Sequence, residues 1–272
     1  MDAKYLELSY WKVGLAAALI LVNGVISITL RLDLERRLIL AAVRTVVQLM
    51  LIGLVLGWIF SPPHHWYLVV GMILAMTSVA GLSAVGRSER RYPGMQFDCL
   101  VSMALSAWTI GAVALAGIVA VRPWYQPQYA IPLVGMILGN TLTGISLGMD
   151  RLTETLTGGR DDVETLLALG ADRWEAAHAA IKNAVRTGMI PIINAMMVVG
   201  IVALPGMMTG QLLSGVEPAQ AVKYQIVIMF LIASGTALGT VSVVLLGYRR
   251  LFNARHQFLH GLIKTRKSSW KK

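Results

Sequence analysis

Residues 38–60 read LILAAVRTVVQLMLIGLVLGWIF, a run of 23 residues in which Arg44 is the one charged side chain. A helix needs about 20 predominantly apolar residues to cross the roughly 30 Å hydrocarbon core of a bilayer. The run is long enough to do so. It therefore predicts a helix that spans a membrane.

The rest of the chain has the same character. Hydrophobic residues make up 56% of the 272 residues and charged residues 14%, well below the roughly 25% charged residues of a soluble domain. We therefore predict an all-α polytopic membrane protein, in which residues 1–272 form a single transmembrane domain. Its seven predicted spans are 11–30, 38–60, 66–85, 99–121, 130–149, 190–213 and 224–246.

The distribution of basic residues predicts the orientation. Lysine and arginine favour the cytoplasmic ends of membrane helices. With seven spans and the C-terminus inside, nineteen of the 24 basic residues fall on the cytoplasmic side and four fall outside. We therefore expect the N-terminus outside, the C-terminus inside, a cytoplasmic segment at 161–190 and a basic cytoplasmic tail at 247–272.

Several classes of protein are excluded or disfavoured by what the sequence lacks. No Gly-Lys pair occurs, so the phosphate-binding loop of P-loop ATPases is absent, and we predict a transport subunit that is not itself an enzyme. No Asp or Glu lies within the seven predicted spans, which disfavours a proton- or sodium-coupled carrier. The last span has no Lys that could form a Schiff base with retinal, which excludes a rhodopsin-like photoreceptor. The net charge of +10 follows from the basic residues of the predicted cytoplasmic loops, so we expect no nucleic-acid partner. We also expect no cofactor.

Residues 161–190, DDVETLLALGADRWEAAHAAIKNAVRTGMI, are a long polar stretch between two spans and are called the coupling segment below. Three leucines form a small apolar face before Gly170, which permits a turn. Asp172 with Glu175 three residues later matches a capping box and predicts a second helix. A soluble partner could bind the membrane protein here.

The coupling segment resembles the coupling loop of the permease subunits of ATP-binding cassette (ABC) transporters. That loop carries Glu-Ala-Ala with Gly six residues after the Glu; Glu164 and Gly170 have this spacing, although Thr165 and Leu166 replace the two alanines. Nearly the whole chain resembles the FetB family of these permeases. The stretches that carry the resemblance are VRTVVQ (43–48), GNTL (139–142), ALGA (168–171), LPGMMTGQ (204–211) and YQIV (224–227). LPGMMTGQ is the most specific of them.

The resemblance implies a transmembrane permease subunit that exports iron, similar also to plant proteins linked to aluminium tolerance. It implies a homodimer that works with two copies of a cytosolic ABC ATPase in the cell inner (plasma) membrane. The expected ATPase contacts are Glu164, Gly170, Ala171 and Glu175. Two alternatives remain: an ABC permease for UDP-glucose or another nucleotide sugar, and a nontransporting membrane sensor or scaffold.

A substrate path without intramembrane carboxylates must use neutral polar groups and freed backbone carbonyls. Arg44 and Gln48 lie one turn apart on one helix face. Either both line a polar pathway, or Arg44 anchors the helix at the membrane–water interface. Asn140 fits either a pathway or an interhelical hydrogen bond. We expect the sixth span to kink or break at Leu204-Pro205-Gly206. The candidate translocation path comprises Arg44, Gln48, Asn140, Thr143, Asn194, Met207, Met208 and Gln211.

The two methionines of this set have two interpretations. Thioethers suit soft metals better than ferric iron, whereas methionine also fills irregular spaces in a core. The single cysteine, Cys99, excludes an intrachain disulfide. The sequence therefore identifies no metal ligands, and a bare iron ion, an iron chelate and another compound all remain candidate substrates.

Overall fold

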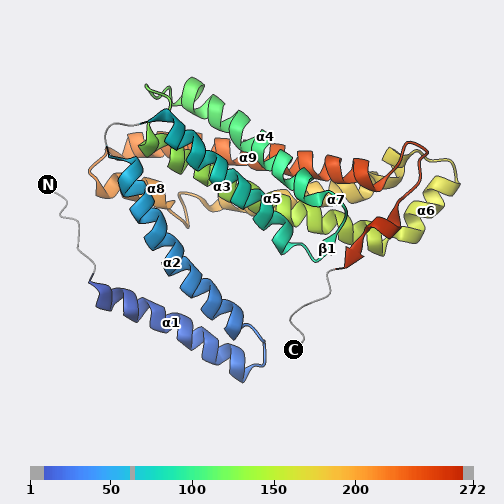
Figure 1. Cartoon of the computed structure of the whole chain (residues 1–272), viewed down its shortest axis with the longest axis horizontal. Helices are drawn as coiled ribbons and strands as arrows, with labels where there is room; N and C mark the ends of the chain where they lie inside the picture. The colour runs from blue at the N-terminus through green and yellow to red at the C-terminus, as the bar shows by residue number, and fades with distance from the viewer. Residues whose placement is uncertain (1–8, 62–64, 266–272) are drawn as a thin grey trace. The chain divides into compact units, whose positions relative to one another are not determined.

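The computed structural model describes residues 9–61 and 65–265, which are almost entirely helical (Figure 1). The N-terminal residues 1–8 and the basic tail residues 266–272 lie outside the described part. In chain order the elements are α1 (Tyr10–Thr29), α2 (Glu35–Ile59), α3 (Trp66–Arg87), β1 (Arg90–Arg91), α4 (Met95–Ala112), the π-helix η1 (Val113–Ile118), α5 (Pro127–Gly158), α6 (Arg160–Ala168), α7 (Arg173–Val198), α8 (Gly206–Leu213), α9 (Pro218–Leu251), the 3-10 helix η2 (His260–Leu262) and β2 (Lys264–Thr265).

Six of the helical segments in the described residues are long and apolar enough to cross a membrane: α1, α2, α3, α4 with η1, α5 and α9. Each overlaps one of the predicted spans, so the prediction of an all-α polytopic membrane protein is confirmed. The count of seven spans and the orientation stay predictions.

The predicted span 190–213 is not one helix. Its first part belongs to α7, which runs without interruption through Pro191 and ends at Val198. The segment 199–205 is irregular, because Val199 is extended and Gly200 adopts the left-handed region at φ +83°; α8 begins only after Pro205. The predicted break is therefore present. It begins at Val199, well before Pro205.

The described residues divide into two compact units, which we treat separately. One is Met1–His64 with Leu213–Gly215, and the other is His65–Leu212 with Val216–Lys272. In the first, α1 and α2 pack against each other across a short connection. Ser27 holds that connection together, because its Oγ donates to Glu35 Oε2 (2.8 Å) and accepts from the N–H of Leu34 (2.9 Å).

The second unit is built around α5, which packs against α3, α4, α7 and α9. Small residues allow the closest of these approaches. A Cβ placed on Gly144 of α5 would lie 2.6 Å from Thr240 Oγ1 of α9, and one placed on Gly188 of α7 would lie 2.6 Å from the carbonyl oxygen of Gly144. Glycine is therefore required at both positions for α5, α7 and α9 to meet at this distance, as small residues commonly are between membrane helices.

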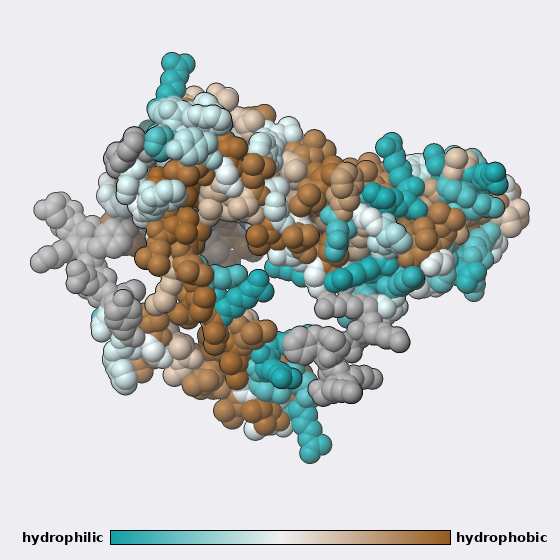
Figure 2. Space-filling model, viewed as in Figure 1, coloured by the Kyte–Doolittle hydropathy of each residue, from teal (hydrophilic) through white to brown (hydrophobic). Residues whose placement is uncertain are grey.

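Two helices of this unit are longer than a membrane is thick. At 1.5 Å per residue, α5 with 32 residues spans about 48 Å and α9 with 34 residues about 51 Å, against a hydrocarbon core of roughly 30 Å. In Figure 2, hydrophilic residues gather at the end of this unit where α6 lies, and hydrophobic residues cover much of the remaining length. The long helices thus carry a polar end that extends beyond the apolar part.

Candidate functional site

The coupling segment consists of α6, a turn at Gly170 and the first half of α7. Gly170 has φ +95°, in the left-handed region that glycine enters without strain, and the N–H of Ala171 donates to the Leu166 carbonyl (3.0 Å) to close the turn. No atom lies within 4 Å of a Cβ placed on Gly170. The turn therefore requires glycine for its backbone conformation and leaves open space beside it.

The second helix of the segment begins with the predicted capping box. One Asp172 carboxylate oxygen accepts from the N–H groups of Trp174 and Glu175, each at 2.7 Å, and Glu175 Oε2 accepts from the N–H of Asp172 (2.9 Å). This prediction is confirmed. Because the Glu175 carboxylate is engaged with its own helix start, its structural role is to fix where α7 begins.

Exposed apolar side chains lie among the polar residues around the turn. Leu169 is 80% exposed, and Leu166 and Trp174 are each exposed on either side of Gly170. Glu164 borders this surface, and its Oε1 accepts from Arg160 Nε (2.7 Å), which raises the pKa of Arg160. We call Leu166, Leu169, Gly170 and Trp174 the docking surface. Sequence reasoning included Gly170 and missed Trp174, although a tryptophan in a polar segment is a visible signal.

The start of α7 is braced by residues near the C-terminus, a contact that the sequence did not predict. His256 Nδ1 accepts from the backbone N–H of Arg173 (2.9 Å), and Arg173 donates from its side chain to the Asn253 carbonyl (3.3 Å). The Trp174 ring meets Tyr248 edge-on at a centroid distance of 5.7 Å. Three residues of the predicted tail, Tyr248, Asn253 and His256, therefore contact the coupling segment. His256 and His260 do not share a helix, because His256 lies in the connection after α9 and His260 is the first residue of η2.

A buried ion pair links the first turn of α4 to the end of α9. Asp98 is 1% exposed, and its two carboxylate oxygens accept from Arg250 Nε at 2.8 and 2.7 Å. The Tyr92 hydroxyl donates to the same carboxylate (2.9 Å), and burial together with this carboxylate raises the pKa of Tyr92. The expectation that the spans lack carboxylates is wrong here, because α4 begins at Met95, four residues before the predicted span.

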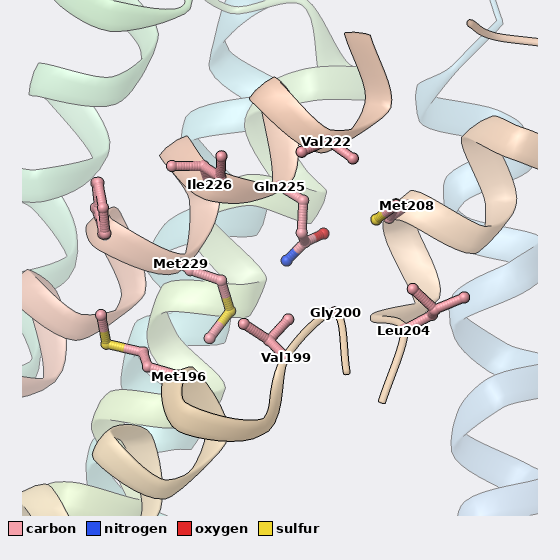
Figure 3. A pocket seen from close by; sticks show the side chains of 10 residues that line it. Met196, Val199, Gly200, Leu204, Met208, Val222, Gln225, Ile226 and Met229 are labelled. Atoms are coloured by element: carbon pink, nitrogen blue, oxygen red, sulfur yellow. The ribbon is translucent and has the colours of Figure 1, made fainter. Parts of the chain in front are cut away.

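Two adjacent pockets lie where α7, the break at 199–205, α8 and α9 meet. The first has a volume of about 420 Å³ and the second about 330 Å³. Both volumes lie within the roughly 300–1,000 Å³ typical of small-molecule sites. We call them the Gln225 pockets, because Gln225 of α9 lines both; Figure 3 shows the first of them. Methionines line them as well: Met136, Met196, Met207, Met208 and Met229.

The structure brings together some of the predicted path residues. Met207 and Asn140 line the second pocket, and Met208 lines the first. Asn140 donates through Nδ2 to the Met136 carbonyl of its own helix (2.9 Å). Thr143, Asn194 and Gln211 line neither pocket. Arg44 and Gln48 are exposed on α2, which belongs to the other unit.

Sequence reasoning also missed Gln225. Its side chain is 6% exposed, and its Oε1 has no hydrogen-bond partner. The signal was available, because Gln225 is a polar residue within a predicted span and belongs to the YQIV stretch. Within the described residues, no group of three or more His, Cys, Asp or Glu side chains is placed to hold a metal ion.

The arrangement defines a multi-pass helical membrane protein with a polar end and two pockets at a helix break. Residues 10–252 match the model of an uncharacterised protein family, UPF0014, and the chain belongs to that family. No solved structure matches the chain.

Three relatives are similar over nearly their full length. The UPF0014 membrane protein slr1647 of Synechocystis is 36% identical over 95% of this chain and 100% of its own length. The protein named probable iron export permease protein FetB of Escherichia coli is 31% identical over 90% of this chain and 93% of its own. The Arabidopsis thaliana protein named ALUMINUM SENSITIVE 3 is 29% identical over 90% of this chain and 88% of its own. The resemblance to the FetB family is therefore confirmed.

Proposed function

We propose that this chain is the membrane permease subunit of an ATP-driven exporter, and that a separate cytosolic ABC ATPase binds its docking surface. The observation that carries the proposal is the continuity of α7. Its first turn adjoins the docking surface, and its last turns, from Met196 to Val198, line the Gln225 pockets. At 1.5 Å per residue its 26 residues span about 39 Å, so one stiff element joins the two sites.

The chemistry of the docking surface supports a protein partner. Exposed leucine and tryptophan side chains in an otherwise polar segment favour association with another protein, and Gly170 leaves room for close approach. The bracing of Arg173 by His256 and Asn253 resists deformation of the α7 start. A push on the docking surface would therefore be passed along α7 toward the pockets.

The name of the Escherichia coli relative supports iron as the first substrate to test and export as the direction. We propose that two copies of this chain act with two ATPase copies in the plasma membrane. The cytoplasmic position of the docking surface follows from the predicted orientation. Alternating access would then consist of movement of α7 and the break at 199–205 during the ATPase cycle.

The test uses the permease reconstituted in liposomes with a candidate cytosolic ABC ATPase from the same cell. We expect ATP hydrolysis that the permease increases and that iron increases further, measured in parallel with other metals and UDP-glucose. Leu169→Glu places a charge on the docking surface and should abolish ATPase binding. Asn183→Glu adds the same charge to an exposed part of α7 beyond this surface and should leave binding unchanged.

Two outcomes would count against the proposal. Normal ATPase binding and transport by Leu169→Glu would remove the docking surface from the mechanism. Binding of the ATPase without transport of any tested compound would favour the sensor or scaffold alternative.

A further inference from the structure

The Gln225 side chain is a buried hydrogen-bond acceptor without a donor. It is 6% exposed, and its Oε1 has no partner. In Figure 3 its amide points into the first pocket, between α9 and the break at 199–205. Leaving a buried acceptor unpaired costs free energy, so such a group indicates a missing partner.

The surrounding backbone does not supply that partner. The N–H of Gly200 donates to the Ala203 carbonyl (2.9 Å), and the N–H groups of Ile201 and Val202 donate to the Val198 carbonyl (3.3 and 3.0 Å). The donor of Asn140 in the second pocket is likewise bonded to its own helix. Among the described lining residues there is no charged side chain. The pockets therefore offer the Gln225 carboxamide, whose Oε1 is an unpaired acceptor, and otherwise largely apolar walls.

This chemistry disfavours two of the candidate substrates in their free form. A nucleotide sugar carries a diphosphate, which requires cationic groups or a cluster of N–H donors rather than one carboxamide. A bare iron ion prefers carboxylate and imidazole ligands, which the lining lacks. The methionine sulfurs do not substitute for them, because in Figure 3 Met196 and Met208 lie on opposite sides of the pocket and their sulfurs do not converge on one point. Their thioethers form instead an adaptable apolar wall.

We propose that the Gln225 pockets bind a largely apolar organic molecule through one N–H or O–H donor that pairs with Gln225 Oε1. The combined pockets have the size and the apolar walls with a single oriented polar group that such ligands require. That the bound molecule is the exported substrate rests on the proposed function. The binding of this molecule to the isolated permease does not depend on the proposed function. If iron is exported, it leaves as an apolar chelate that presents such a donor.

The test uses two probes that differ by one methyl group, which replaces the donor hydrogen; comparison with Gln225→Leu separates loss of the donor from the added methyl group. N-phenyl-1-naphthylamine is apolar and has one N–H, and its N-methyl derivative has none. Equilibrium dialysis against nanodiscs with the permease, corrected with empty nanodiscs, measures saturable binding of each. We expect the wild-type chain to bind the N–H probe about three- to tenfold more tightly, the equivalent of one hydrogen bond.

Gln225→Leu removes the acceptor at similar volume and should bind both probes equally. Gln211→Leu makes the same change on α8, where the side chain lines neither pocket, and should keep the wild-type preference. Met229→Trp fills the space that both pockets share and should abolish saturable binding of both probes; thermal unfolding in nanodiscs confirms that each variant is folded.

The proposal is overturned if the wild-type chain shows no saturable binding, or if Gln225→Leu keeps the preference for the N–H probe. It is also overturned if UDP-glucose or ferrous iron displaces the probes. Because the ATPase is absent from this experiment, failure here leaves the ATPase test of the proposed function intact. Conversely, failure of ATPase binding leaves this result unaffected.

Discussion

The backbone N–H of Arg173 donates to Nδ1 of His256, 83 residues further along the chain, at 2.9 Å. Arg173 is the first residue of α7, where a helix leaves N–H groups without intrahelical partners. Asp172 bonds two of the following N–H groups, and His256 bonds this one. The start of α7 is thus capped partly by its own sequence and partly by the far end of the chain.

Replacing His256 should loosen the start of α7 without affecting the apolar helices. His256→Ala removes one hydrogen bond, so the amide hydrogens at the start of α7 should exchange about fivefold faster. Hydrogen exchange followed by mass spectrometry measures this in peptides that cover 170–178. His260→Ala is the control, because His260 contacts the Phe258 ring and not α7. Unchanged exchange in His256→Ala would mean that the bond does not brace the helix.

Breaking the buried ion pair should destabilise the second unit. Asp98→Ala removes one charge-assisted hydrogen bond that the Arg250 Nε–H shares between the two carboxylate oxygens, and one hydrogen bond from Tyr92. Because the Arg250 side chain is 40% exposed and water can solvate it in part, we expect a loss of about 2–3 kcal/mol. Unfolding of the purified protein in nanodiscs measures it. Asp161→Ala, an exposed aspartate at the start of α6, should have little effect.

Tyr92 should make the protein sensitive to alkaline pH. Its pKa is raised in the folded state, so the folded protein keeps a proton that the unfolded chain releases above the ordinary tyrosine pKa of about 10. The stabilisation is therefore complete below about pH 10 and is lost as pH rises above it. Tyr92→Phe should be less stable at pH 8 and should lose less stability between pH 8 and pH 11. Parallel loss in both proteins would contradict this.

Close packing at Gly188 should tolerate no side chain. In Gly188→Ala the Cβ would lie 2.6 Å from both the Gly144 carbonyl oxygen and Thr240 Cγ2, and we expect a loss of about 1–3 kcal/mol from overpacking. Gly139→Ala is the matched control, since no atom lies within 4 Å of a Cβ there. In the control, alanine should be neutral or stabilising by up to about 1 kcal/mol, because it favours a helix over glycine. Equal unfolding midpoints for the two variants would contradict the packing described.

Substitution of Gly170 should weaken coupling more than it weakens the fold. A β-branched residue is strained at φ +95°, so Gly170→Val should displace the turn of the docking surface. Asn tolerates this region better, so Gly170→Asn should retain more of the ATPase stimulation. Circular dichroism should show the same helix content in both. Wild-type stimulation by Gly170→Val would show that the turn conformation is not needed for coupling.

The apolar runs were enough to place most of the helices, because burial in hydrocarbon depends on local composition. Their ends were harder to place. The first turn of α4 contains Asp98, which a hydropathy criterion rejects and which only Arg250, 152 residues away, makes tolerable. Likewise, the predicted span begins at Ile190, whereas α7 begins at Arg173 and continues through Pro191, packed against α5 and α9.

The candidate functional residues also divide into those that local rules predict and those that depend on tertiary contacts. The capping box and Gly170 follow from local rules and were predicted. The bracing by His256 depends on tertiary structure and was not predictable from spacing. Met207, Met208 and Asn140 were placed in a pathway for their chemistry, and they line the pockets. Gln225 is the residue that gives the pockets their polarity, and its burial without a partner becomes visible only once α7, α8 and α9 are placed together.

The pairing of β1 with β2 has a consequence for biogenesis. Arg90 lies opposite Thr265, so the connection between α3 and α4 acquires its strand partner only when the last part of the chain has been synthesised. Helices that insert into the membrane one after another can therefore be in place while the polar end is still incomplete. We therefore expect a chain truncated before Lys264 to insert its helices and yet lack the β1–β2 pairing, so that the polar end is completed only after the last long helix has been made.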